Sequence, residues 1–366
     1  MRLSTTLSFY MGRHFLLAFL ALISLFILLI FTFDIVELLR RAANKPDVTV
    51  RAVLEMASLK LPNMAVQTFP FAILFGGMAA FWRLSRSHEL VVTRAAGVSA
   101  WQFLFPVLMT ALLLGLFQVM ALGPLASSSL SRFERLEARL LKGQRSSLAI
   151  SSSGLWLRQS TEEGQAVVHA QTVLQQGTEV ELWNVSIFRY RAMDRFDSRI
   201  EAEYAKLSDG YWELRNARIL VPDEPSRRVA ALHFATDLTV NKIQDSFSPP
   251  ETMSFWSLPG FITTLEQAGF SALRHRLHFH AQLASPLLLC AMVLLAASFT
   301  LRTGRRSGAT FVILAGVMTG FLVHFFSDIV FALGLSDSIP VILAAWSPAA
   351  VATLLGLALL LHLEDG

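Results

Sequence analysis

The sequence has a single cysteine and few charged residues. Cys290 is the only cysteine among 366 residues, which excludes a disulfide scaffold and a cysteine metal cluster. Asp, Glu, Lys and Arg make up 16% of the chain, whereas 54% of the residues are hydrophobic. A typical soluble domain carries about a quarter charged residues. The composition therefore favours a protein embedded in a membrane.

The chain also lacks the signatures of common nucleotide and metal sites. No G-x-x-x-x-G-K-[ST] motif occurs, so the chain cannot bind ATP through a P-loop. We expect any ATP-driven work to come from a partner protein, and we expect this chain to bind no cofactor of its own. His275, His278 and His280 form a histidine cluster, but the arginines around them favour a basic collar at a membrane interface over a metal site.

Two serine clusters raise the alternative of a Ser-Lys hydrolase. Ser127–Ser129 and Ser151–Ser153 lie on either side of Lys142 in the sequence. A catalytic dyad needs that lysine buried beside one serine, whereas serines are common in turns and at strand edges. The structural interpretation is the simpler one, and we predict no catalytic residue.

Six hydrophobic segments are long enough to cross a membrane as helices, which takes about 20 residues. They are Phe15–Val36, Leu61–Trp82, Trp101–Leu122, Ala281–Leu301, Thr310–Leu333 and Ile339–Leu361. The first follows a basic N-terminus, as a secretory signal does. Its apolar core is too long for a signal, and no small-residue cleavage pattern follows it. We predict that it stays in the protein as an anchor.

Lysines and arginines in the short loops predict the orientation. Three basic groups fall on one side if the helices alternate, and the positive-inside rule makes that side cytoplasmic. These groups are Arg2 and Arg13, then Arg83, Arg86 and Arg94, then Arg302, Arg305 and Arg306. A fourth basic group faces outward and opposes the rule: Arg40, Arg41, Lys45, Arg51 and Lys60. We interpret this group as a binding feature. Arg40 and Arg41 could bind phosphate oxygens at the headgroup level, with snorkelling to anionic lipid headgroups as the alternative.

The polar middle of the chain is predicted to lie outside the cytoplasm and to form strands. Hydrophobic and polar residues alternate there with a period of two, most clearly at 183–187, 200–204 and 232–240. Short strands without intervening helical patterns predict one all-β, jelly-roll-like domain. A solvated helix at 130–142 should precede it, and an amphipathic helix at 261–280 should follow it.

The predicted fold is therefore an α-helical membrane protein with six transmembrane helices and an inserted all-β periplasmic domain. Residues 1–122 should form the first three spans, and residues 279–366 the last three. Residues 123–278 should form the β domain with its helical connectors.

A charged segment at residues 83–97 lies between the second and third spans. Ser87 can cap a helix start, Glu89 would lie in the first turn, and Gly97 can end the helix. We predict a short polar helix over residues 84–97, lying across the cytoplasmic ends of two spans. Such a helix can receive force from a cytosolic partner.

Ionisable residues within the spans are few, and burying them in lipid is costly. Asp34 lies near the outer end of the first span, and His324 and Asp328 lie one turn apart on the fifth. We expect His324 and Asp328 to pair inside the helix bundle. A proton relay, which would make the protein a secondary transporter, usually needs such groups on more than one helix.

These features together resemble a known family. Phe69-Pro70-Phe71, Gly76-Gly77, residues 87–97 and Gly154-Leu155-Trp156 occur in the same order as in the LptF/LptG (YjgP/YjgQ) permeases of the lipopolysaccharide export ABC transporter. The resemblance covers essentially the whole chain. The Glu-Leu-Val-Val sequence at 89–92 and the short tail resemble the LptG branch more than the LptF branch, which is the alternative.

The resemblance implies roles for particular residues. Glu89 matches the acidic residue of the family's coupling helix, which docks on an ATPase. Its neighbours would complete the docking surface: Arg86, His88 and Arg94. Arg40 and Arg41, with Lys45, would lie beside the phosphates of lipid A.

The same resemblance implies a lateral gate formed by the first and fifth spans. Asp34, His324 and Asp328 are the polar gate candidates. Asp34 departs from the family, because the resemblance implies a lysine at this position. The number of phosphate contacts is therefore in question for this chain.

The resemblance also implies partners and a location. The partners are an LptF-like permease subunit, an LptB-like ATPase dimer that uses ATP, an LptC-like single-span periplasmic protein, lipopolysaccharide and membrane lipids. No nucleic acid is expected. The location is the bacterial inner membrane, and the function is to pass lipopolysaccharide from its outer leaflet to a periplasmic bridge. A non-transporting anchor for a periplasmic domain would explain the topology but not the need for six spans and a charged island.

Overall fold

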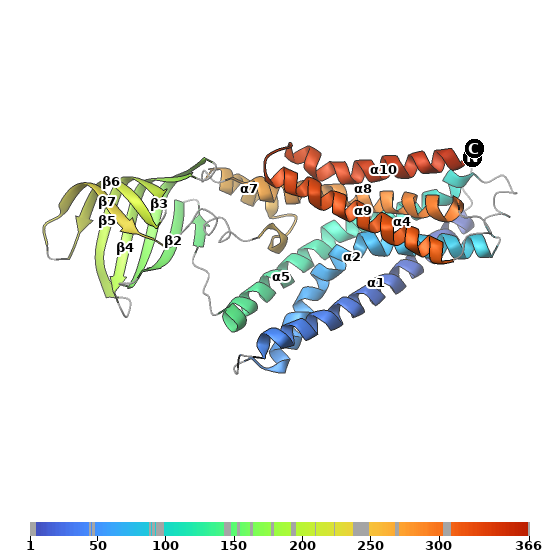
Figure 1. Cartoon of the computed structure of the whole chain (residues 1–366), viewed down its shortest axis with the longest axis horizontal. Helices are drawn as coiled ribbons and strands as arrows, with labels where there is room; N and C mark the ends of the chain where they lie inside the picture. Colours follow the sequence, from blue (N-terminus) through green and yellow to red (C-terminus); the bar gives the residue numbers. More distant parts are fainter. Residues whose placement is uncertain are drawn as a thin grey trace. The chain divides into compact units, whose positions relative to one another are not determined.

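The computed structural model describes residues 5–43, 45, 48–87, 89, 92, 99–142, 148–151, 154–161, 164–176, 179–191, 195–208, 210–222, 224–236, 249–267, 271–302 and 309–364. The chain divides into two compact units, one of helices and one built around a sheet (Figure 1). The helical unit contains residues 1–141, 251–256 and 276–366, and the sheet unit contains residues 142–250 and 257–275.

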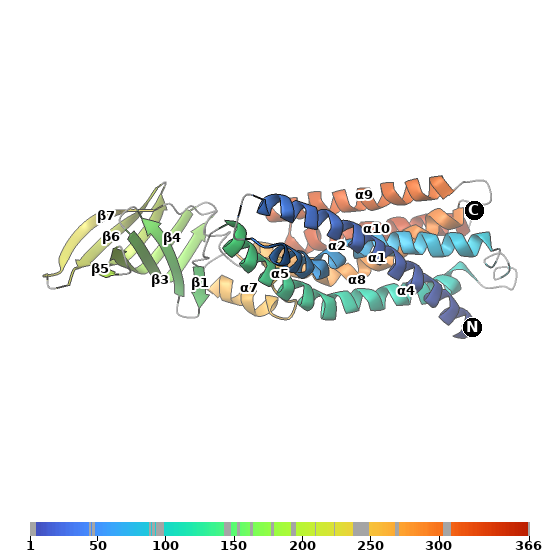
Figure 2. The same ribbon diagram turned by 90° about the horizontal axis from the view of Figure 1, so that it is seen from below.

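Within the part of the chain that the structure describes, six helices are long and apolar enough to cross a membrane, which confirms the prediction. Five of them are single helices: α1 (Thr5–Ala42), α2 (Val50–Arg86), α8 (Leu273–Arg302), α9 (Ala309–Leu335) and α10 (Val341–Glu364). The third span is a continuous run from α4 (Ala100–Phe117) through η1 (Gln118–Leu122) and α5 (Gly123–Glu137) to η2 (Ala138–Lys142). Helix α1 begins and α10 ends at the same end of this unit (Figure 2), as an even number of crossings requires.

The helices differ in how much of their surface this chain buries. In the most hydrophobic window of each helix, 61% of α2 and 67% of α8 is buried, against 17% of α1 and 22% of α9. Helices α2 and α8 thus form the centre, with a core that includes Phe15, Ile73, Phe81, Phe103 and Leu289. The apolar faces of α1 and α9 are left for lipid or for another protein.

The third span contains two π-helical segments, η1 and η2. At η1 the N–H of Gly123 donates to the carbonyl of Gln118, a π-type bond, and Pro124, which has no N–H, follows at once. The Gln118 side chain is buried and reaches the carbonyl of Val66 on α2 at 3.5 Å. The irregular turn therefore lies where a proline and a buried amide fall close together along the third span.

The charged segment differs from the prediction at its start. Helix α2 continues through Arg86, and Ser87 is its C-terminal cap: the Ser87 hydroxyl donates to the carbonyls of Arg83 at 3.2 Å and Leu84 at 3.3 Å. The prediction that Ser87 begins a new helix is wrong, because its hydroxyl bonds to the preceding turn. Glu89 and Val92 are helical, and the rest of 88–98 lies outside the described residues.

In the described residues, the sheet unit contains seven antiparallel strands in consecutive order. They are β1 (Leu148–Ser151), β2 (Gly154–Thr161), β3 (Gly164–Gln176), β4 (Glu179–Arg191), β5 (Arg195–Ser208), β6 (Tyr211–Leu220) and β7 (Arg227–Ala235). The all-β class of the insert is confirmed. Each described strand pairs with its neighbours in sequence, so the sheet is a meander, which refines the jelly-roll-like expectation.

One face of the sheet carries the core of this unit. Leu182, Ile187, Trp212 and Leu214 are fully buried on it, and Leu265 from α7 (Leu258–Gln267) packs against it. The amphipathic helix predicted at 261–280 is instead two helices, because α7 ends at Gln267 and α8 begins at Leu273.

The alternation of faces is interrupted along a line that runs from β4 through β5 to β6. Trp183 and Asn184 on β4, like Arg215 and Asn216 on β6, are consecutive exposed residues, whereas strand residues normally alternate between faces. Both asparagines have φ of 52°, a left-handed conformation that asparagine tolerates. Tyr204 lies on this line. Burial, the larger cause, and the hydrogen bond from its hydroxyl to Glu181, the smaller one, together raise the pKa of Tyr204 to about 12.

We predict that Gly115→Ala destabilises the helical unit. A Cβ at Gly115 would lie 2.7 Å from Cα of Pro286, so α4 and α8 would have to separate. Overpacking of this kind costs about 1–3 kcal/mol. The midpoint of thermal unfolding in detergent should fall, whereas the control Gly260→Ala, whose Cβ would meet nothing within 4 Å, should leave it unchanged. Equal midpoints for the two variants would contradict the close approach of α4 and α8.

Candidate functional site

The outer ends of α1, α2 and α5 converge on a small hydrophobic cluster that positions several charged side chains. Leu38 and Ala42 from α1, Val53 and Met56 from α2, and Phe133 from α5 are buried together. Basic and acidic residues surround this cluster, because each helix turns polar as it leaves its apolar span. Asp34, Arg40 and Arg41 lie in the C-terminal part of α1, which places them in this region.

Asp34 forms a buried ion pair with Lys60. The Asp34 side chain is only 7% exposed, and its Oδ1 accepts a hydrogen bond from Nζ of Lys60 on α2. The Lys60 ammonium also lies 5.2 Å from the centre of the Phe133 ring. The second oxygen, Oδ2, is buried without a hydrogen-bond partner in the described part of the chain. The sequence singled out Asp34 but gave no sign of Lys60 as its partner.

Arg41 forms ion pairs with two carboxylates. It pairs with Glu37 one turn earlier on α1 and with Glu137 of α5, whose Oε1 lies 3.3 Å from Arg41 Nη1. Arg40 is exposed in the same last turn of α1, and Lys45 follows the helix with its backbone N–H donating to the Ala42 carbonyl at 2.9 Å. Arg40, Arg41 and Lys45, which were predicted to bind phosphate, therefore lie at the same end of the helices but make different contacts.

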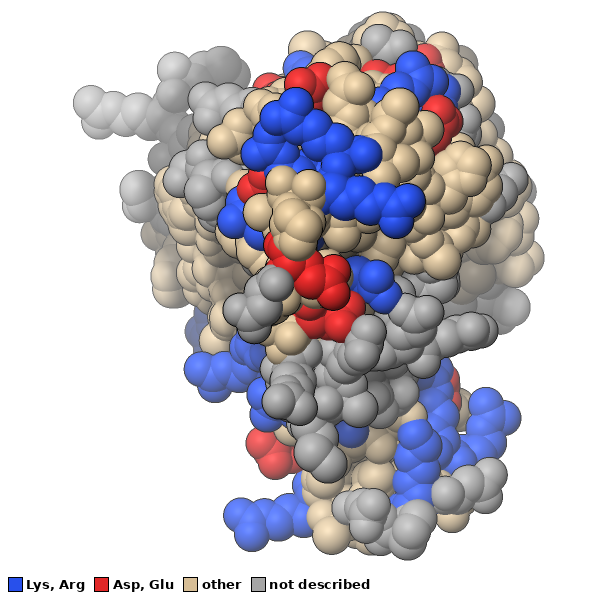
Figure 3. Space-filling model, turned by 90° about the vertical axis from the view of Figure 1, so that its left-hand side faces the viewer, with Lys and Arg blue, Asp and Glu red and all other residues tan. Residues whose placement is uncertain are grey.

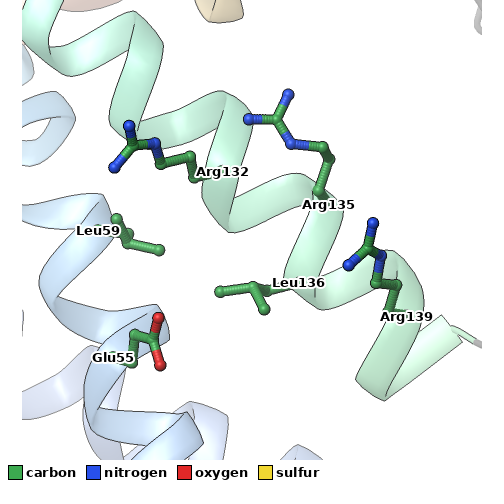
Figure 4. A pocket seen from close by; sticks show the side chains of 6 residues that line it. All are labelled: Glu55, Leu59, Arg132, Arg135, Leu136 and Arg139. Carbon is green, nitrogen blue, oxygen red and sulfur yellow. The ribbon is translucent and has the colours of Figure 1, made fainter.

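A hollow of about 230 Å³ lies between α2 and the α5–η2 helix. Arg132, Arg135 and Arg139 extend from α5 and η2, and Glu55 and Leu59 from α2 line the other side (Figure 4). Arg135 Nη1 donates to Ser131 Oγ at 2.9 Å. Three guanidinium groups around one hollow suit an anion such as phosphate.

The sequence interpretation missed this arginine row. Residues 130–142 were expected to form a solvated helix, and the helix is present. The signal that could have found the row is the spacing of its members, since positions i, i+3 and i+7 share one helix face.

At the opposite end of the helices, Glu89 is tied to α1. Tyr10 Oη donates to Glu89 Oε2 at 2.9 Å, and the Tyr10 ring contacts His14 at a centroid distance of 4.4 Å. The Arg86 guanidinium lies 5.1 Å from the centre of the Trp82 ring. His88 and Arg94, which were predicted beside Glu89, lie outside the described residues. Tyr10 was not anticipated, because a contact across 79 positions leaves no local pattern.

His324 and Asp328 form a pair on an exposed face of α9. His324 Nε2 lies 3.5 Å from Asp328 Oδ2, and the two side chains are 60% and 65% exposed. Their predicted location inside this chain's bundle is therefore wrong: α9 turns them, with Phe321 and Phe325, away from the core. They face lipid or another subunit.

No group of three or more His, Cys, Asp or Glu side chains able to hold a metal occurs within the described residues. His275 is buried and its ring lies 5.1 Å from that of Phe261, while His278 Nε2 lies 2.8 Å from Gln282 Nε2. These histidines are thus engaged in packing and hydrogen bonding.

Some charges on the sheet unit form ion pairs with one another. Arg199 lies 2.6 Å from Glu201 and Arg215 lies 3.1 Å from Glu213, and basic and acidic groups occur side by side on the face shown in Figure 3. The arginine row of the helical unit lines one hollow, which makes it the stronger candidate for binding an anion.

Comparison with known proteins matches nearly the whole chain. The family model of the lipopolysaccharide export system permease LptF/LptG matches residues 9–362. The lipopolysaccharide export system permease protein LptG of Escherichia coli K12 is 27% identical over 311 residues, which cover 83% of this chain and 84% of the relative. The LptG protein of Haemophilus influenzae is 25% identical over 350 residues, which cover 94% of each chain.

We predict that Lys60→Met strongly destabilises the helical unit. The variant leaves the Asp34 carboxylate buried and unpaired, which costs about 3–5 kcal/mol when one partner of a buried pair is removed. Arg40→Met removes an exposed cation from the same region and should cost less than about 0.5 kcal/mol. Thermal unfolding of the purified protein in detergent measures both. Similar midpoints for the two variants would show that the Asp34–Lys60 pair is not buried as described.

Proposed function

The chain belongs to the LptF/LptG family of lipopolysaccharide export permeases, and from this premise we propose how it takes part in export. It is a transmembrane permease subunit of the lipopolysaccharide export transporter of the bacterial inner membrane. Its proposed work is to receive lipopolysaccharide from the outer leaflet and to pass it to a periplasmic bridge. Because the similar curated proteins carry the name LptG, we propose that it fills the LptG position beside an LptF-like subunit.

The observation that carries the cargo assignment is the arginine-lined hollow between α2 and α5. Arg132, Arg135 and Arg139 supply bidentate donors suited to phosphate oxygens. Arg40 and Lys45 lie at the same end of the helices, and Arg41 can join them when a phosphate competes with Glu37 and Glu137. Lipid A phosphates would bind here while acyl chains contact the exposed apolar face of α1.

We propose that energy arrives at the other end of the helices. The chain has no P-loop, so ATP would be used by an LptB-like dimer on the cytoplasmic side. Glu89, with Arg86, His88 and Arg94 around it, would form the contact with that dimer. The Tyr10–Glu89 hydrogen bond supports this role, because it joins the contact to α1.

The exposed helix faces support the proposed subunit arrangement. Helices α1 and α9 are the least buried spans, so the sister permease and the lateral gate would lie along them. The His324–Asp328 pair lies on this face of α9, and Asp34 lies on α1. An LptC-like protein would complete the complex on the periplasmic side.

The proposed cycle links the two ends of α1. ATP binding would close the cytosolic dimer, shift the Glu89 contact and tilt α1, which is the least buried of the described spans. The cavity against the sister subunit would then collapse and push the lipid toward the sheet units. Strands β1 and β7 are the outer strands of the described sheet, and edge pairing with neighbouring sheets would extend the path.

Neutralising the arginine row should weaken lipopolysaccharide binding. Arg132→Gln and Arg139→Gln each remove a charged hydrogen bond worth about 1.5–3 kcal/mol, which is about tenfold or more in affinity. Binding to the complex in nanodiscs measures the effect. Arg227→Gln is the control, because Arg227 is exposed at the start of β7 and does not line the hollow. A loss in the control as large as in the row variants would reject the hollow as the site.

Removing the Glu89 carboxylate should weaken the ATPase contact. Glu89→Ala deletes a charge-assisted interaction, and we expect about a tenfold loss of ATPase association together with loss of export. Co-purification and vesicle export assays measure the two effects. Glu364→Ala, at the end of α10, removes a carboxylate from the same end of the helices and should behave as wild type.

Tyr10→Phe refines the coupling test. It removes only the hydroxyl that donates to Glu89 and keeps the ring beside His14. We expect normal ATPase association with less lipid exported per ATP. Normal export in Glu89→Ala would refute the coupling role.

A further inference from the structure

Carboxylates are placed among the cations of the proposed phosphate site. Asp34 pairs with Lys60, Glu137 and Glu37 pair with Arg41, and Glu55 lines the hollow opposite the arginine row. Each carboxylate lowers the positive potential that a phosphate would meet there. The outer end of the helices is therefore less cationic than its number of lysines and arginines suggests.

The Asp34–Lys60 pair is the least accessible of these interactions. Asp34 is 7% exposed and the Lys60 side chain 26%, whereas the Arg41 and Glu37 side chains are about half exposed. Little water screens the pair, so Asp34 cancels most of the Lys60 charge. A surface phosphate cannot easily displace a carboxylate held this way, while the more exposed Glu37 can rotate away from Arg41.

A neutral Asp34–Lys60 pair leaves less positive charge for a second phosphate. Two phosphates brought together in a site with little water repel each other strongly, so each of them needs cations beside it. One phosphate can be satisfied by the arginine row. A second phosphate would approach the remaining cations, of which Lys60 is already neutralised by Asp34.

We propose that Asp34 determines substrate specificity, and that it makes this permease select lipopolysaccharide whose lipid A carries one phosphate or none over the bisphosphorylated form. The inference rests on the proposed function, since it assumes that lipid A binds at the outer ends of α1, α2 and α5. The inference adds the class of substrate that this same site would select. Asp34 acts through Lys60, by keeping that ammonium unavailable.

The test compares three lipid A probes on the complete transporter. The complex is reconstituted in nanodiscs, and the rate of ATP hydrolysis is measured with bisphosphoryl, monophosphoryl and phosphate-free lipid A. The wild-type complex should be stimulated more by the monophosphoryl or phosphate-free probe than by the bisphosphoryl probe. Glu224→Gln, which removes a carboxylate in the turn between β6 and β7, should keep the wild-type order.

Two variants separate charge from structure. Asp34→Asn keeps the side-chain shape and frees the Lys60 charge, so the ratio of bisphosphoryl to monophosphoryl stimulation should rise about fivefold or more. The double variant Asp34→Asn with Lys60→Gln also loses the ion pair but frees no cation, and it should keep the wild-type ratio. If Asp34→Asn does not assemble, the wild-type order still tests the proposal, because a preference for bisphosphoryl lipid A overturns it.

The outcomes are distinguishable from failure of the proposed function. A wild-type preference for bisphosphoryl lipid A, or an equal rise of the ratio in the single and double variants, would overturn the role of Asp34 while leaving lipid A export intact. If no lipid A of any kind stimulates the wild-type complex, the proposed function itself fails.

Discussion

A charge inside a low-dielectric environment must be neutralised by a partner, and the outer end of the helical unit depends on this constraint. Asp34 lies on α1 within the apolar part of the chain, and it is accommodated only because Lys60 reaches it from α2. Phe133 of α5 lies over the same ammonium, so one interaction joins three helices. The Arg41–Glu137 pair makes a second link from α1 to α5. These links hold the helix ends that carry the arginine row.

The same constraint explains why the site is a mixture of signs. A cluster of cations alone at this depth would repel itself, and each member would need water or a lipid phosphate to remain stable. Carboxylates at Glu37, Glu55 and Glu137 provide internal counterions in the absence of cargo. Binding a phosphate then becomes an exchange of one anion for another, which limits affinity and favours release. A carrier that must let its cargo go benefits from this arrangement.

The sequence predicted the features that depend on runs and periods, and missed those that depend on tertiary contacts. Six spans and an all-β insert follow from hydrophobic length and two-residue alternation, and both were confirmed. Ser87 was misassigned because a serine hydroxyl can accept from the next turn or donate to the previous one, and only the path of α2 decides. The partners Lys60 and Tyr10 are 26 and 79 positions from Asp34 and Glu89, beyond any local pattern. The exposure of His324 and Asp328 is likewise set by how the helices pack.

The form of α1 bears on how its two ends communicate. It is one uninterrupted helix of 38 residues, or about 57 Å at 1.5 Å per residue. The Tyr10 contact with Glu89 lies near its start, and Asp34, Arg40 and Arg41 lie near its end. A continuous helix transmits displacement along its axis without intermediate switches, and α1 has no internal proline at which to bend. The middle of α1 packs against α2 through the Phe19–Phe69 and Phe26–Phe75 ring contacts, and its two ends carry the proposed ATPase contact and phosphate site. Motion at one end therefore has a direct mechanical route to the ion pairs at the other.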